Sequence, residues 1–246
     1  MRHLLFLFIF TLSSCGGGSA GNDPLPVEED TARDCQDKDL LKNTDNTWKL
    51  TYETFQNGSV SAVIVTKTFH IDSLNAEFSD QKELTVLSLS ETQITPGTIV
   101  TENYKSYFRL GENSEKTVYG YINAGQLNIS SWNNTEYYNP AYTDSRYNLK
   151  SGETLKFTIT GRFVKNSYYP GSPGREEGVI ERAKTIKYVG KDAITTQVGQ
   201  LKACKFIIDD RQEWVWRGFP IQEADNKGEI TRRVKEITLN NAAIRP

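Results

Sequence analysis

Apolar and polar residues alternate along most of the chain from residue 47 onward. The clearest example is the segment 155–160 (LKFTIT), in which apolar or aromatic positions alternate with Lys and Thr. This period of two is typical of a strand that buries one face. Comparable segments, rich in β-branched and aromatic residues, lie at 47–53, 61–72, 82–90, 98–110, 116–123, 126–132, 179–189, 200–209, 213–216 and 230–239. The pattern predicts about ten strands separated by turns.

Strands at such short, regular spacing, with no repeat of fixed period, predict a mainly β chain built on a single antiparallel sheet. We expect this sheet to be curved into a half-barrel or packed as a sandwich, with at most one or two short helices. Residues 30–43 carry the helix signals, since Asp30 or Thr31 could cap a helix and Leu40 and Leu41 could dock it. Residues 133–147, which are polar and aromatic with one Pro, are expected to form an ordered loop.

The first residues form a different pattern, a basic start followed by an apolar run at 4–12. A run of this length is too short to span a bilayer as a helix, which needs about 20 residues. It fits the hydrophobic region of a signal peptide. Two small residues, Ser13 and Ser14, then precede Cys15. The pattern predicts that residues 1–14 are a signal peptide and that the chain is exported.

The run Leu12-Ser13-Ser14-Cys15 resembles the lipobox of bacterial lipoproteins. The resemblance implies cleavage before Cys15, acylation of that cysteine and attachment of the protein to the membrane through lipid, because two or three acyl chains hold a protein stably. Residues 15–29, rich in Gly, Pro and acidic side chains, would be a flexible tether, and residues 30–246 one β-rich domain. Gly16 follows the cysteine, which by the same resemblance implies the outer membrane of the cell envelope. The alternative is an ordinary secretory signal with Cys15 free.

Two cysteines remain, Cys35 and Cys204. An even remainder in an exported chain predicts a disulfide, because the compartments outside the cytoplasm are oxidising. The alternative is a pair of buried free thiols. A redox motif of the C-x-x-C type is absent.

Charge and composition exclude several classes of function. The net charge is −2 with no basic stripe, so nucleic acid is not expected as a partner. Beyond the signal peptide the only histidine is His70, which we expect to be a surface or satisfied residue, and no phosphate-binding motif occurs. We therefore expect no cofactor, no metal site and no enzymatic activity. A hydrolase that uses paired carboxylates, such as Glu176-Glu177 or Asp209-Asp210, is the alternative.

The most distinctive part of the chain is the segment 187–208. It resembles a β segment of the LolA, LolB and LppX type of periplasmic half-barrel proteins, through Tyr188, Gly190, Asp192, Thr195, Gly199, Leu201, Cys204, Lys205 and Phe206. The resemblance implies a sheet wrapped around an apolar cavity that holds lipid. On this basis the first hypothesis for function is a non-enzymatic envelope lipoprotein that binds a lipid or another apolar ligand.

A cluster of aromatic residues carries the second hypothesis, a surface for a partner protein or a carbohydrate. Aromatic rings present flat apolar faces with a polar edge, which suits stacking on sugar rings. Tyr is also a good packing residue in strands, and this is the alternative. The candidate contact residues are Trp132, Tyr137, Tyr138, Tyr142 and Tyr147.

Overall fold

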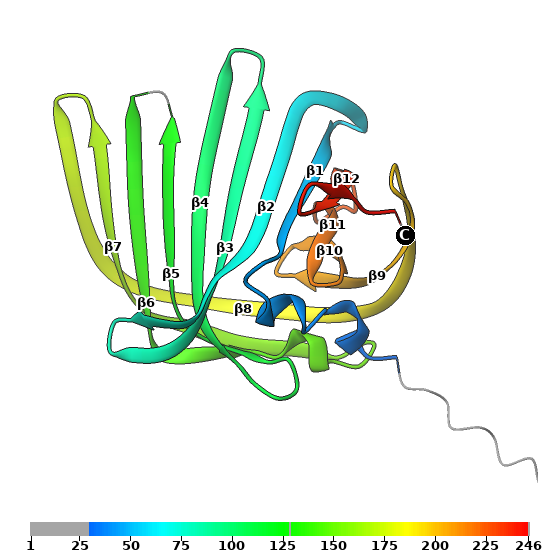
Figure 1. Cartoon of the computed structure of the whole chain (residues 1–246), viewed down its shortest axis with the longest axis horizontal. Coiled ribbons are helices and arrows are strands. Elements are labelled where there is room, and N and C mark those ends of the chain that lie inside the picture. Colours follow the sequence, from blue (N-terminus) through cyan, green and yellow to red (C-terminus); the bar gives the residue numbers. More distant parts are fainter. Residues whose placement is uncertain (1–29, 128, 246) are drawn as a thin grey trace, which may run out of the picture.

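The computed structural model describes residues 30–127 and 129–245, and nearly all of them belong to one antiparallel sheet (Figure 1). The mainly β class predicted from the alternation is confirmed. The strands are β1 (Thr47–Gln56), β2 (Ser59–Phe78), β3 (Gln81–Thr95), β4 (Thr98–Leu110), β5 (Lys116–Leu127), β6 (Ser130–Asp144), β7 (Thr154–Tyr169), β8 (Ser172–Thr196), β9 (Gly199–Ile208), β10 (Arg211–Trp216), β11 (Phe219–Ala224), β12 (Ile230–Leu239) and β13 (Ala242–Ala243).

The sheet closes on itself. Each strand pairs with the next along the chain, and β1 also pairs with β12, from Trp48↔Leu239 to Thr54↔Arg232. The molecule is therefore a closed barrel of twelve strands, and the predicted half-barrel or sandwich is wrong. Alternation identifies each of the two closing segments as a strand, but it carries no information about which strand is the partner.

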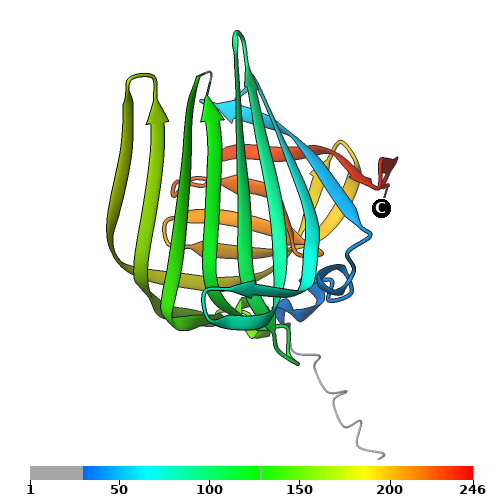
Figure 2. The same cartoon turned by 60° about the vertical axis from the view of Figure 1, so that its left-hand side comes forward.

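The strands fall into two groups by length. Strands β2 to β8 have 12 to 25 residues, whereas β9 to β12 have 6 to 10. In Figure 2 the long strands stand side by side as a wall, with the short strands behind them. Strand β8 joins the two groups, since it pairs with β7 at its start and with β9 at its end. Its register shifts between Tyr188 and Gly190, which marks a β-bulge at this point of the strand.

Among the described residues there is no α-helix, only three 3₁₀ turns: η1 (Ala32–Cys35), η2 (Leu40–Lys42) and η3 (Arg146–Asn148). The helix predicted over 30–43 is therefore wrong. The Asp37 carboxylate accepts hydrogen bonds from the backbone of Asp39 and Leu40, an arrangement that competes with helical pairing. Leu40 and Leu41 are nevertheless buried in the core, as expected. None of the helices in the described residues 30–127 and 129–245 is long and apolar enough to cross a membrane.

The segment 133–147, predicted to be a loop, is mostly strand. Strand β6 covers it up to Asp144, and η3 follows. Along β6 most side chains are half-buried or exposed on both faces, and Glu136 is the exception. Because neither face is uniformly apolar, the residues show no alternation of hydrophobicity, and the strand is held by backbone pairing with β5 and β7.

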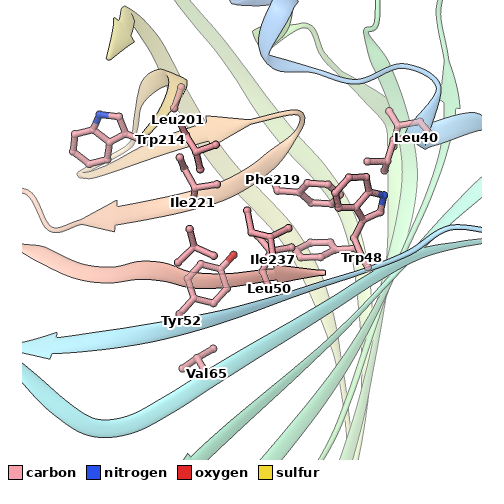
Figure 3. Close-up of a cluster of buried hydrophobic side chains, with 14 of the residues drawn as sticks. Leu40, Trp48, Leu50, Tyr52, Val65, Leu201, Trp214, Phe219, Ile221 and Ile237 are labelled. Carbon is pink, nitrogen blue, oxygen red and sulfur yellow. The ribbon is translucent and has the colours of Figure 1, made fainter. Parts of the chain in front are cut away.

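Two hydrophobic clusters form the core. The first is built mainly from β1 and the short strands, including Leu50, Tyr52 and Ile237 (Figure 3). The second surrounds the Cys35–Cys204 disulfide, which confirms the predicted pairing, and contains Tyr188 and Phe206.

Candidate functional site

The long strands β4 to β8 have two distinct faces. One face looks toward the first core cluster, because it carries Phe108 and Val118, which belong to that cluster, and Tyr138 and Tyr142, which pack against it. On the opposite, outer face the end of β2 folds over the sheet, and the Phe78 ring stacks on the rings of Tyr107 and Tyr137. Side chains that alternate along these strands thus point either into the barrel or away from it.

The inward face of β4, β5 and β6 alternates aromatic and polar side chains in successive cross-strand rows. Glu102 and Trp132 share one row, with Gly125 between them. The other two rows are Tyr104–Asn123–Asn134 and Ser106–Tyr121–Glu136. We call the set the inner wall: Glu102, Tyr104, Tyr121, Asn123, Trp132, Asn134 and Glu136. All of them except Glu136 retain partial solvent exposure.

Trp132 lies across the backbone of Gly125. A Cβ at residue 125 would come within 2.0 Å of the indole ring, so only glycine leaves room for it. The indole Nε1 donates a hydrogen bond to Asn123 Oδ1 at 3.0 Å. Space and hydrogen bond together fix the ring along the wall, where it stays partly exposed. A fixed, partly exposed ring is a preformed stacking surface.

Two tyrosine rings, those of Tyr104 and Tyr121, lie in the two rows that follow the row of Trp132. The centroids of Tyr104 and Tyr121 are 5.8 Å apart, and the Tyr104 hydroxyl donates to the Glu102 carboxylate. Burial, with a smaller contribution from Glu91, raises the pKa of Glu102, and burial also raises the pKa of Tyr121. The Tyr121 phenol is therefore held in its neutral form and can donate a hydrogen bond.

Glu136 is the polar centre of the inner wall. Its carboxylate accepts hydrogen bonds from Asn134 Nδ2 at 3.2 Å, from the Tyr138 hydroxyl at 2.7 Å and from the Arg182 guanidinium. Because Nδ2 faces Glu136, the other end of the amide is Oδ1, and this buried oxygen has no hydrogen-bond partner among the described residues. An unpaired buried acceptor is costly unless a ligand or water completes it.

Charged residues close the barrel interior on two sides. At the base, Arg146 pairs with Asp144, and burial lowers the pKa of the nearby Lys116 to about 8. At the closing strands, Lys67 lies 3.1 Å from Glu223 and 3.6 Å from Glu91, and Arg232 bonds to Glu91 at 3.2 Å. The surroundings of the inner wall thus include these charged side chains as well as the apolar side chains of the first core cluster.

The structure separates the five aromatic residues singled out in the sequence. Trp132, Tyr138 and Tyr142 lie on the inward face, where the Tyr138 and Tyr142 rings are 5.2 Å apart. Tyr137 is on the outer face, against Phe78 and under the Arg162 guanidinium. Tyr147 is buried in the second core cluster and contacts Phe206. The candidate set is therefore not one loop surface.

A shallow groove of about 640 Å³ runs along the outer face beside Tyr137. Phe78 and Asp80 line one side of it, and Asn139 and Arg162 line another. Phe78 and Tyr137 already stack on each other within this lining, so their rings serve the packing of the β2–β3 turn. The inner wall, in contrast, carries rings together with an unpaired acceptor.

Sequence reasoning did not single out Tyr104, Tyr121, Asn134 or Glu136. They come from three strands, and only the register brings them into adjacent rows. The one available signal was the aromatic and amide content of both 116–123 and 126–134 on either side of a turn. His70, expected to be satisfied, has its Nε2 at 2.6 Å from Asp72 Oδ1.

In the part of the chain that the structure describes, no three side chains of His, Cys, Asp or Glu gather in a way that could hold a metal ion. Cys15 and the tether lie outside the described residues. Comparison with known proteins places the chain in no group: no protein-family model, no curated protein and no solved structure matches it.

Proposed function

We propose that this chain is a non-enzymatic lipoprotein of the bacterial cell envelope that binds a carbohydrate on the inner wall of its barrel. The observation that carries the proposal is Trp132, held across Gly125 beside the Tyr104–Tyr121 pair and the unpaired Asn134 Oδ1. A sugar ring offers an apolar face for stacking and hydroxyls for hydrogen bonds. On the inner wall, aromatic rings and the amide or carboxylate groups of neighbouring strands lie side by side in the same rows.

The chemistry of the wall favours a carbohydrate over the lipid or other apolar ligand of the first hypothesis. An acyl chain would have to cover Asn134 Oδ1 and the half-buried Glu102 carboxylate without offering them a hydrogen bond, and burying such polar groups costs free energy. A hydroxyl-bearing ligand supplies donors and acceptors at the same positions. Binding of the apolar class would instead require a lining of aliphatic side chains.

The envelope location rests on the N-terminal pattern and gains support from the Cys35–Cys204 bond, since disulfides persist in oxidising compartments. The signal peptide and lipobox lie in residues 1–29, outside the described residues. We expect metabolic labelling with a fatty acid to mark the protein in bacterial cells and the Cys15→Ala variant to remain unlabelled. Equal labelling of both proteins would contradict attachment at Cys15.

A glycan array tests the binding proposal. The probe is the chain from residue 15 with Cys15→Ser, which lacks the apolar run and the acylated thiol. We expect retention of a related set of glycans, recovered unchanged after prolonged incubation. A blank array would contradict the proposal, and a lipid-sized adduct in native mass spectrometry would favour the apolar ligand instead.

A further inference from the structure

Four turns at one end of the barrel are free of charged residues. They join β1 to β2, β3 to β4, β5 to β6 and β7 to β8, and Figures 1 and 2 show them at the same end of the long wall. The uncharged stretches around these turns are 54–66, 92–101, 117–135 and 166–174. Charged residues make up 24% of the whole chain, so these four uncharged stretches differ from the rest of the sequence. Because they meet at one end of the barrel, they give that end an uncharged surface.

The same end gathers exposed apolar side chains. Among the described residues, eight of the eleven large hydrophobic residues with exposed side chains lie in these stretches: Val60, Ile64, Ile94, Ile99, Leu127, Ile129, Tyr168 and Tyr169. Ile64 pairs with Ile94, and Ile94 pairs with Ile99, so three isoleucines form one row across β2, β3 and β4. We call these eight residues the rim.

The opposite end has the reverse character. Its turns between β2 and β3, between β4 and β5, and between β6 and β7 span 79–80, 111–115 and 145–153, and each contains at least one charged residue. The chain also enters the barrel there, since Asp30 accepts a backbone hydrogen bond from Ser151. The molecule is therefore polarised along the long strands, with a charged end where the chain enters and an uncharged apolar end at the rim.

We propose that the rim docks into the interface of a phospholipid bilayer. Insertion penalises charge and rewards apolar side chains, and Tyr prefers the boundary between headgroups and acyl chains. The rim has this composition in four separate turns at the same end of the long strands, so one bilayer surface can receive them together. The Thr, Ser and Asn side chains that follow on the outer face of β3 and β6 then stay at the level of water and headgroups.

Vesicle flotation tests the proposal, with the chain from residue 15 carrying Cys15→Ser and neutral phosphatidylcholine vesicles. We expect the protein to float with the vesicles equally at low and high salt, because binding of this kind follows buried apolar area rather than charge. Replacing Ile94 and Ile99 together by Lys should reduce partitioning by about tenfold or more, since each change removes apolar area and adds a charge. Both residues are exposed, so the fold should persist.

The matched control replaces Val179 and Val189 by Lys, two exposed apolar residues of β8 outside the rim. This variant carries the same added charge and should float like the parent. Equal flotation of the two double variants, or no flotation of the parent, would overturn the proposal. If the parent does not float, sedimentation without vesicles tests the other occupant. A concentration-dependent dimer that is lost in the Ile94→Lys, Ile99→Lys variant would overturn the bilayer proposal, because the rim would then bind a second copy of the chain.

Discussion

Tyr52 shows how a single polar atom ties the closing strand of the barrel to the short strands. Its ring has no exposed surface in the first core, and its hydroxyl donates a hydrogen bond to the Pro220 carbonyl of β11 at 2.6 Å. We expect Tyr52→Phe to lower the free energy of unfolding by about 1–2 kcal/mol, because the buried carbonyl loses its donor. Urea denaturation measures this, with the exposed Tyr168→Phe as control. Equal losses in the two variants would contradict the assignment.

Lys116 provides a pH-dependent test of the charged base. Burial lowers its pKa to about 8 from the ordinary 10.5, so between these values the unfolded chain binds its proton more tightly than the folded chain. The penalty for burying the ammonium is fully present below pH 8 and disappears as the pH rises toward 10.5. We therefore expect the stability of the parent relative to Lys116→Met to increase across this window. A constant or falling difference in denaturation measurements would contradict the burial of this charge.

At the residue scale, the sequence predicted side chains whose environment follows from chemistry alone. The pairing of Cys35 with Cys204 and the burial of Leu40 and Leu41 are confirmed. It could not predict that Asn134 and Glu136 lie beside Asn123 and Tyr121, because this depends on the register between β5 and β6. For polar residues of this kind the partner, not the residue type, decides whether a site exists.

At the element scale, the pairing of Gly125 with Trp132 determines the form of the inner wall. The nearest heavy atoms to a Cβ at residue 125 all belong to the Trp132 ring. We expect Gly125→Ala to displace the indole, shift its fluorescence and destabilise the fold by about 1–3 kcal/mol through overpacking. In a Trp132→Ala background the same change should cost much less, because the obstructing ring is gone. Additive effects in this double-mutant cycle would argue against the contact.

Strand β6 explains why one element was predicted wrongly. Hydrophobicity alternates with a period of two only when one face of the strand is buried and apolar and the other is exposed and polar. On β6, polar and aromatic side chains occur on both faces, so no alternation results. Strands with a single buried face, such as β1 and β9, were recognised from their alternation. The segment that the sequence pattern missed carries Asn134 and Glu136 of the inner wall, whereas the other wall residues lie in segments that were predicted as strands.

At the scale of the whole molecule, the disulfide links the chain entry to β9 across 169 residues. Replacing Cys35 and Cys204 together by Ala should lower the free energy of unfolding by about 4–5 kcal/mol, because the unfolded chain regains the entropy of this loop. Chemical denaturation with and without reductant measures the loss. The reductant should weaken the parent and leave the variant unchanged. A parent that is insensitive to reductant would contradict a stabilising role.

Closure of the barrel is the feature of the whole molecule that the sequence did not reveal. It depends on β1 meeting β12, and the two strands are far apart along the chain. Their pairing places Lys67 of β2 next to Glu223 of β11 and Arg232 of β12 next to Glu91 of β3. These contacts add ion pairs to the apolar interior, and an open half-barrel would not bring them together.

The most direct test of the proposed carbohydrate site is a calorimetric titration with the glycan that the array selects. The parent, Trp132→Ala and Tyr168→Ala are compared under the same conditions, since Trp132 is on the inner wall and Tyr168 is an exposed ring elsewhere. We predict that Trp132→Ala weakens binding by about tenfold or more, as expected for loss of roughly 1.4 kcal/mol of stacking, and that Tyr168→Ala binds like the parent. Unchanged affinity in Trp132→Ala would contradict the central claim that the inner wall is the binding site.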